Sequence, residues 1–274
     1  MNGFDWGAFG VVTLTSLLAI AVGMAVTATI GVRIGRHNVV DVSWGAGFVL
    51  IALVSAIVGT GDLWRRLLML ALVAIWGLRL ATHMAIRSRG KGEDPRYEEM
   101  LGRATGSRTL YALRKIYLTQ GISLWFVSLP IQVAAVSNGS FGLLVVLGIA
   151  LWIVGVTFET VGDRQMEEFK SDPGSRGHIM DQGLWAWTRH PNYFGDACVW
   201  WGIFLVSASV WPGVLTVLSP IAMTYFLVFA TGARLLERHM EQRPGYREYQ
   251  QHQHGDGDDP VHDRADQKLF DIGA

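Results

Sequence analysis

The chain has 274 residues, of which 50% are hydrophobic and 17% are charged, and it contains 11 tryptophans. Such a composition is too apolar for an ordinary soluble domain of this length and indicates an integral membrane protein. The 23 basic and 23 acidic residues cancel to a net charge of zero, so no excess of positive charge indicates a nucleic-acid partner.

Apolar residues arrive in blocks that approach or reach the ~20 residues needed to cross a bilayer core. The first block is longer than the apolar region of a signal peptide, and Arg33 and Arg36 follow it instead of preceding it. We therefore interpret it as a retained helix. The expected fold class is all-α, a polytopic membrane helix bundle of about seven transmembrane helices. The predicted spans are residues 8–32, 40–60, 64–86, 112–136, 140–161, 192–209 and 212–233.

The loops between these spans alternate in charge. Basic residues gather in the loops after the first, third and fifth spans, whereas "SNGS" and "SASVWP" contain none. Arg65 and Arg66 are the exception on the opposite side, but the excess elsewhere outweighs two residues. The positive-inside rule therefore predicts an N-terminus outside and a cytoplasmic C-terminus.

Two further features concern the organisation of the chain. Residues 1–250 are predicted to form one integral membrane domain. Residues 251–274 are rich in Asp and His and have no apolar period, which is typical of an acidic, disordered cytoplasmic tail. No spacing of the tail histidines supports a metal site. Cys198, the only cysteine, lies inside a predicted span, where we expect it to act as a small core hydrophobe.

Polar residues occur where the second and third spans meet the cytoplasm. Asp41 opens the second span, and Arg79, His83 and Arg87 repeat at a spacing of four along the third. A charged residue near the middle of a span costs about 2.5 to 3.5 kcal/mol, so each is a site candidate. Asp41 is a candidate proton donor and His83 a candidate to orient a substrate carbonyl. The alternative is that Asp41 pairs with an arginine such as Arg79 in a purely structural contact.

The charged loop "RSRGKGEDPRYEEM" follows the third span. Arg96 with Tyr97 is a candidate to close over a ligand, and the alternative is a solvated loop.

Three later spans carry polar side chains at their cytoplasmic ends, at spacings that place them on one helix face. These residues are Glu159 and Asp163, then Asn192 and Asp196, then Arg234, Glu237, Arg238 and Glu241. The coincidence favours a pocket for a soluble nucleotide. The alternative is an interfacial belt of ion pairs and snorkelling side chains.

The stretch "TRHPNYFGD", residues 188–196, introduces the sixth span. Pro191 suits the first position of a helix, and the backbone N–H groups that follow are free to attract an anion. With Arg189 and His190 beside it, this helix start is a candidate phosphate site, and Asn192 suits sugar or amide groups. A plain cytoplasmic anchor would show a similar pattern.

The segments "FETVGDRQMEEFKSDPG", "GLWAWTRHPNYFGD" and "ARLLERHMEQRPGYREYQ" resemble the C-terminal domain of the steroid 5-alpha-reductase superfamily. The closest likeness is to its bacterial membrane branch, which also carries elements like "DVSWG". The resemblance covers most of the chain to about residue 250. It implies a bundle of seven helices in the bacterial inner (plasma) membrane, with NADPH bound at the cytoplasmic side.

The resemblance also implies roles for individual residues. The implied cofactor set is Asp163, Lys170, His178, Asn192, Tyr193, Asp196 and Arg234, to which the helix start adds Arg189 and His190. Lys170 and His178 stand where arginines are usual, so positive charge is kept only in part. Asp41 is the nearest counterpart of the family's catalytic acid, and Trp76 lies near the position of its tyrosine.

A rival resemblance shares the same helix start. Membrane methyltransferases similar to isoprenylcysteine carboxyl methyltransferase carry an Arg-His-Pro-x-Tyr-x-Gly element, matched here by Arg189–Gly195, and a later segment matched loosely by residues 245–249. There the element holds S-adenosylmethionine. Asn192 and Asp196 favour the reductase, because they suit the larger dinucleotide.

The function expected from these residues is NADPH-dependent reduction of a carbon–carbon double bond. The substrate class is a lipid, sterol or fatty-acyl-type molecule that enters from the bilayer, with membrane lipids as the other partners. The alternatives are an S-adenosylmethionine-dependent lipid methyltransferase and a non-catalytic membrane protein that binds lipid or a partner.

Overall fold

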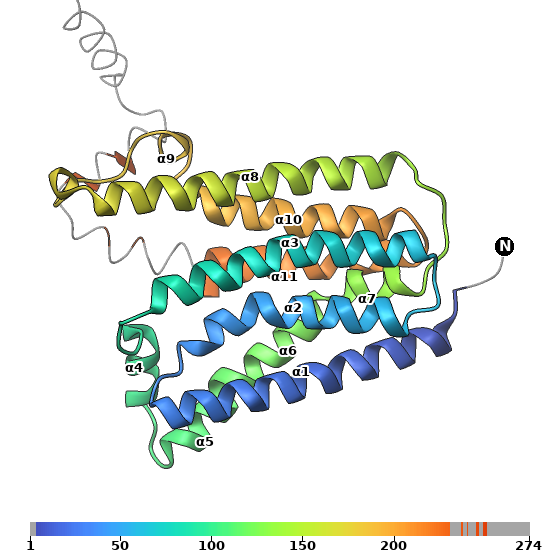
Figure 1. Ribbon diagram of the computed structural model, residues 1–274, viewed down its shortest axis with the longest axis horizontal. Helices are drawn as coiled ribbons and strands as arrows, with labels where there is room; N and C mark the ends of the chain where they lie inside the picture. The colour runs from blue at the N-terminus through green and yellow to red at the C-terminus, as the bar shows by residue number, and fades with distance from the viewer. Residues whose placement is uncertain (1–3, 231–236, 238–239, 241–244, 247–248, 251–274) are drawn as a thin grey trace, which may run out of the picture. The chain divides into compact units, whose positions relative to one another are not determined.

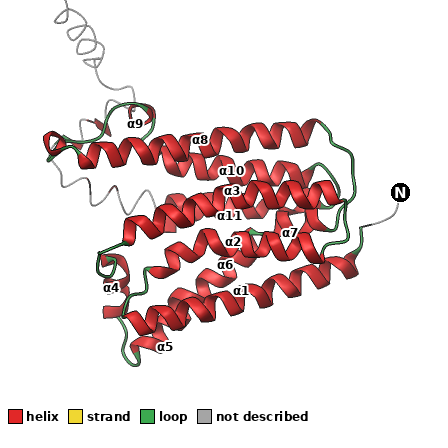
Figure 2. Cartoon of the chain, viewed as in Figure 1, coloured by secondary structure: helices red, strands yellow, loops and turns green. Residues whose placement is uncertain are grey.

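A computed structural model describes residues 4–230 together with residues 237, 240, 245, 246, 249 and 250. Every regular element in this part of the chain is a helix, and no strand is present in it (Figure 2). The predicted all-α class is therefore confirmed. The predicted tail, residues 251–274, lies outside the described residues, so the predicted boundary at residue 250 stays a prediction. The described residues pack as two compact units, one within residues 1–153 and 198–223, the other within residues 154–197 and from 224 onward.

Three long helices begin the first unit: α1 (Trp6–Ile34), α2 (Val39–Val58) and α3 (Leu63–Ser88). Figure 1 shows α2 between α1 and α3, and α2 packs against both. A side chain on Gly45 would place its Cβ 2.4 Å from the carbonyl oxygen of Gly77. The backbones of α2 and α3 can approach this closely only because both positions are glycine, as is common between membrane helices.

The predicted fourth span is interrupted. It consists of α5 (Arg108–Ala112), a π-helical turn (Leu113–Tyr117), α6 (Leu118–Val127) and α7 (Leu129–Ala135). Pro130 in the first turn of α7 has no N–H to continue the ladder of α6. The backbone N–H of Ser128 caps α6 at the carbonyl oxygens of Leu124 and Phe126. The carbonyl oxygen of Trp125 accepts hydrogen bonds from Ser128 Oγ at 2.8 Å and Gln132 Nε2 at 3.1 Å. Both side chains are buried, so the break is satisfied from within the protein, as an apolar setting requires.

The remaining helices start with α8 (Leu143–Ser171), α9 (Leu184–Trp187) and α10 (Pro191–Ala208). A 3₁₀ turn (Gly213–Val217), α11 (Leu218–Tyr225) and a π-helical turn (Phe226–Ala230) follow. Within the described residues, α1, α2, α3 and α8 are the helices long and apolar enough to cross a membrane. They support an integral membrane protein. The seven-span count, the orientation and the identity of the membrane stay predictions.

The core of the first unit contains an aromatic cluster. Phe48, Trp76 and Trp200 are fully buried. The ring of Trp200 lies 4.4 Å from that of Phe48 and 5.5 Å from that of Trp76, centroid to centroid. Trp76, which the resemblance places near a catalytic tyrosine, is packed into the core.

Arg65 and Arg66, the exceptions in the charge pattern, bind helix ends. Arg65 is fully buried, and its Nη1 donates to the carbonyl oxygen of Val206 and to Ser209 Oγ, both at 3.0 Å. Arg66 Nη1 donates to the carbonyl oxygen of Ala56 at 2.9 Å. Val206 and Ala56 lie in the last turns of α10 and α2, where carbonyl groups lack partners and a positive charge is favoured. A structural role accounts for both arginines.

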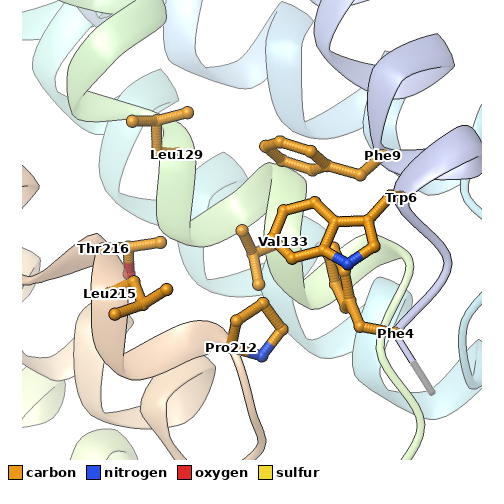
Figure 3. Close-up of a pocket in the computed structure, with 8 residues that line it drawn as sticks. All are labelled: Phe4, Trp6, Phe9, Leu129, Val133, Pro212, Leu215 and Thr216. Atoms are coloured by element: carbon orange, nitrogen blue, oxygen red, sulfur yellow. The ribbon is translucent and has the colours of Figure 1, made fainter.

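An apolar groove opens at the end of the first unit where α1 begins (Figure 3). Its volume is about 160 Å³. The groove is lined by Phe4, Trp6, Phe9, Leu129, Val133, Pro212, Leu215 and Thr216. This lining suits apolar groups and offers no charge for a phosphate.

Candidate functional site

The polar residues singled out from the sequence fall into both units. In the first unit they surround the start of α4 (Pro95–Gly102), a short helix that follows the loop after α3. Asp94 caps α4, because its Oδ1 accepts the backbone N–H of Arg96 at 2.9 Å. Pro95 occupies the first turn, as expected at a helix start. The Arg96 side chain folds back onto Asp94, with Nε 2.9 Å from Oδ1.

Tyr97 follows in the same turn and reaches α2. Its hydroxyl donates to Asp41 Oδ1 at 2.6 Å, and Arg96 Nη2 lies 3.5 Å from Asp41 Oδ2. Asp41 therefore lies beside an arginine, as the structural alternative expects, and that arginine is Arg96 of α4. We call Asp41, Asp94, Arg96 and Tyr97 the Asp41 cluster.

Burial and neighbouring charges shift the pKa values of Tyr97 and Asp94. Burial, and then the negative charge of Asp41, raise the pKa of Tyr97 above its usual value. Burial alone would raise the pKa of Asp94, but the hydrogen bonds and the charge of Arg96 outweigh it, so that pKa is lowered. Tyr97 thus keeps its proton and Asp94 loses its own near neutral pH. The pair of Tyr97 and Asp41 has one phenolic proton to donate.

The loop before α4 is fastened to the start of α2. The Glu93 carboxylate accepts the backbone N–H groups of His37 and Asn38, the latter at 2.9 Å. Asn38 Nδ2 donates to the carbonyl oxygen of Gly92 at 3.1 Å. Glu93 therefore caps α2 from another segment, since the Asn38 side chain makes no capping bond of its own. These contacts hold Tyr97 over Asp41.

His83, the second predicted catalytic residue, lies in α3 and is half-buried. The side-chain partners of Asp41 among the described residues are Tyr97 and Arg96, so the Asp41 cluster does not include His83. A catalytic role for His83 stays a prediction.

In the second unit, α8 and α10 approach at glycines. A Cβ on Gly195 would lie 2.5 Å from the carbonyl oxygen of Gly155 and 2.8 Å from the backbone nitrogen of Glu159. The start of α10 is therefore pressed against the turn of α8 that carries Glu159. Glu159 is only 3% exposed, and Asp163 follows one turn later on α8 and is half-buried. The glycine spacing brings a polar turn of α8 to the predicted phosphate corner.

Arg189 and His190 converge on one carboxylate. Glu237 Oε1 lies 3.0 Å from Arg189 Nε and 3.2 Å from His190 Nε2. The His190 ring stacks on that of Tyr193, with centroids 5.3 Å apart and planes 17° apart. Burial lowers the pKa of His190; Arg189 acts in the same direction, and the hydrogen bond to Glu237 opposes the shift without cancelling it. We call Arg189, His190, Tyr193 and Glu237 the α10 corner.

The backbone donors at this corner are less free than the sequence predicts. The N–H of Tyr193 donates to Asn192 Oδ1 at 3.1 Å, and that of His190 donates to Thr188 Oγ1 at 3.4 Å. The expectation of free N–H groups is therefore wrong at Tyr193, because the short Asn192 side chain folds back onto the backbone.

Short helix α9 covers the same region of the second unit. Trp185 Nε1 donates to the carbonyl oxygen of Gly162 at 3.0 Å, and the N–H of Leu184 donates to Gln165 Oε1 at 3.0 Å. Tyr249 then donates to the carbonyl oxygen of Trp185 at 2.6 Å. These bonds connect α8, α9 and a residue near the end of the described chain.

The other predicted cofactor residues are distributed around this corner. Asn192 and Asp196 lie in the first turns of α10 and are half-buried. Lys170, in the last turn of α8, and His178, in the following loop, are exposed. Arg234 lies outside the described residues. The structure therefore brings Arg189 and His190 together through Glu237, stacks Tyr193 on His190, and places Lys170 and His178 at the surface.

Two contacts of these sites were not predicted. The sequence singled out Tyr97 only as a group that closes over a ligand, although the Asp-Pro pair before it is a helix-start signal. It placed Glu237 on a polar helix face without linking it to Arg189. The i,i+4 spacing that located the other polar pairs carries no information on contacts between distant segments.

The family described as Protein of unknown function (DUF1295) matches residues 28–253. The match covers most of the chain, including both groups of polar residues, and the chain belongs to this family. No curated protein matches the chain, and no solved structure matches it.

Proposed function

For this member of the DUF1295 family, we propose that the chain is a membrane-embedded, NADPH-dependent reductase of a carbon–carbon double bond. The substrate class is a lipid, sterol or fatty-acyl-type molecule. The observation that carries the proposal is the 2.6 Å hydrogen bond from the Tyr97 hydroxyl to the Asp41 carboxylate. The resemblance to the steroid 5-alpha-reductase superfamily, in which an acidic residue and a tyrosine polarise the substrate carbonyl, agrees with this pair.

The chemistry of the pair suits reduction of an enone. A tyrosine with a raised pKa keeps its single phenolic proton. In the free protein this proton is donated to Asp41, so the O–H would turn from Asp41 to the substrate carbonyl when substrate binds. As negative charge develops on that oxygen, the Tyr97 proton moves to it. Asp41 holds the phenol in place before the reaction, and solvent restores the proton afterwards. Tyr97 thus supplies the acid that Trp76 at the family's tyrosine position cannot.

The second unit offers groups that fit a dinucleotide. Arg189 and His190 already bind an oxyanion, the Glu237 carboxylate, which is the chemistry that phosphate binding requires. Asn192 and Asp196, within two turns of that corner, suit hydroxyl and amide groups. When bound, NADPH supplies the hydride that reduces the β-carbon, leaving the saturated product and NADP⁺.

The surface of the first unit suits a hydrophobic substrate. α1 exposes Leu14, Leu18 and Val22, each more than 60% exposed, along a helix apolar enough to span a bilayer. An exposed apolar face of this kind is expected to contact lipid chains. A substrate dissolved in the bilayer would reach the protein without crossing water.

The proposal is tested on the detergent-purified protein. NADPH should raise the Tm by mass action, and S-adenosylmethionine should not. Oxidation of NADPH should then depend on an added lipid extract that contains enones, with loss of the double bond followed by mass spectrometry. A Tm shift with S-adenosylmethionine alone, with no oxidation of NADPH, would refute the reductase.

One observation favours the methyltransferase as a second candidate. The α10 corner contains Glu237 beside Arg189 and His190, and Glu159 and Asp163 lie on the nearby part of α8. This carboxylate content suits a cationic sulfonium cofactor better than a pyrophosphate. In that case a methyl group would pass from the sulfonium to a lipid nucleophile, with release of S-adenosylhomocysteine.

A further inference from the structure

We propose that Glu237 is an internal anion that occupies the anion-binding position of Arg189 and His190, so that a phosphate-bearing ligand binds only by displacing it. This inference rests on the proposed function in that it takes the α10 corner as the phosphate end of the cofactor site. It adds a specific role for a residue outside the implied cofactor set.

The geometry at Glu237 is that of a bound oxyanion. A single carboxylate oxygen, Oε1, accepts from Arg189 Nε at 3.0 Å and from His190 Nε2 at 3.2 Å. A phosphate oxygen would make the same two contacts. Because both nitrogens already share this oxygen, a second anion cannot take the position until Glu237 leaves.

Burial makes this contact stronger than an ordinary surface ion pair. The side chains of Arg189, His190 and Glu237 are 23%, 13% and 20% exposed. Partial exclusion of water strengthens the attraction relative to fully exposed pairs. Displacement therefore requires a ligand with more charge than one carboxylate, which a pyrophosphate has.

Two tyrosines that follow Glu237 in the chain have contacts in the same unit. Tyr249 binds the carbonyl oxygen of Trp185 at 2.6 Å, and Tyr246 is only 3% exposed, with its ring 5.9 Å from that of Tyr249. An anion held in the same chain competes at a high effective concentration. The apparent affinity for a ligand is then the intrinsic affinity multiplied by the fraction of molecules in which Glu237 has left.

The experiment measures binding of inorganic pyrophosphate to the detergent-purified full chain by calorimetry. In Glu237→Gln the amide keeps the shape of the side chain but loses the charge. We expect this variant to bind pyrophosphate about fivefold to tenfold more tightly than the wild type, in line with about 1 kcal/mol for such a pair. Arg189→Gln should bind more weakly than the wild type.

Glu168→Gln is the matched control. Glu168 lies in the same unit and pairs with Arg164 on the surface of α8, and its side chain is 63% exposed. The Glu168→Gln variant loses the same charge without a change at the α10 corner. Its affinity for pyrophosphate should therefore equal that of the wild type. An equal gain in Glu168→Gln would overturn the inference, because the effect would then be one of net charge.

A second variant covers the case in which Glu237→Gln fails to fold. Tyr249→Phe removes the hydrogen bond to the carbonyl oxygen of Trp185 and changes no charge. We expect about threefold tighter pyrophosphate binding, which is the effect of one neutral hydrogen bond. Unchanged or weaker binding in folded Glu237→Gln or Tyr249→Phe overturns the inference, as does the absence of pyrophosphate binding in every form. Tighter binding together with no NADPH-dependent reduction would leave it intact while rejecting the reductase.

Discussion

In the first unit a carboxylate is the group that other side chains surround, whereas in the second unit the surrounded groups are the hydrogen-bond donors of an arginine and a histidine. Asp41 receives a phenol and a guanidinium from α4. Arg189 and His190 receive a carboxylate from Glu237. In both units the partner comes from a segment distant in sequence, so each functional group is compensated only when the chain is folded. Under the proposed function, the carboxylate of the first unit serves proton donation and the donors of the second unit serve anion binding.

Tyr97→Phe is expected to have the largest effect on this comparison. It removes the donated proton but keeps the ring, so the rate of NADPH-dependent reduction should fall at least about 100-fold, the usual contribution of a general acid. Steady-state kinetics with a lipid enone measure the change. Tyr225→Phe, at a tyrosine that is 56% exposed, should react at the wild-type rate. A Tyr97→Phe enzyme as fast as the wild type would show that Asp41 is not part of an acid pair.

Gly195→Ala should weaken the second unit alone. The new Cβ would lie 2.5 Å from the carbonyl oxygen of Gly155, and overpacking of this kind costs about 1 to 3 kcal/mol. A lower Tm and weaker binding of pyrophosphate should follow, because the start of α10 can no longer seat against α8. Gly10→Ala is the control, since its Cβ would meet nothing within 4 Å. Equal Tm values for the two variants would mean that the close approach is not required.

Glu93→Gln should loosen the Asp41 cluster without changing any of its members. The amide accepts the N–H groups of His37 and Asn38 more weakly than the carboxylate, at an expected cost of about 1 kcal/mol. Hydrogen exchange at these two amides should quicken, and the reduction rate should fall about fivefold. Glu98→Gln, at an exposed residue of α4, should change neither quantity. If the rate falls while exchange stays slow, Glu93 acts on the reaction in some other way than by holding the loop.

The smallest expected effect is the change of the Tm with pH that the titration of His190 produces. Its pKa in the folded protein is lowered, so below about pH 6.5 the unfolded chain binds more protons than the folded one. Stability from this group is therefore present above that pH and is lost as the pH falls. Thermal unfolding followed through this range should show a decrease in Tm that is smaller in His190→Gln. Identical profiles for the two proteins would contradict the lowered pKa.

Much of the helical framework could be predicted from apolar runs alone. The predicted spans 8–32, 40–60 and 64–86 differ from α1, α2 and α3 by at most two residues at each end. Hydrophobic length determines these helices, because a long apolar block has few other ways to satisfy its backbone in a membrane. The fourth span shows where this prediction fails. Pro130 interrupts the helix, and a count of apolar residues does not predict such a break.

The site was predictable only in part. Spacing identified Asp41, Arg189 and His190, because each lies beside a span where polar residues are costly. Their partners Tyr97 and Glu237 lie 56 and 47 positions away from Asp41 and His190. No local pattern indicates which distant segment returns to a given helix end, so these contacts depend on tertiary packing.

The partners of Arg65 also bear on how the chain is made. Its guanidinium binds Val206 and Ser209, which lie 141 and 144 positions further along the sequence. During synthesis, α3 leaves the ribosome long before either acceptor exists, so this charge lacks both of these partners while the intervening helices are made. The first unit can therefore reach its final packing only after residue 209 has been made, and a chain truncated earlier should be a substrate for membrane quality-control proteases.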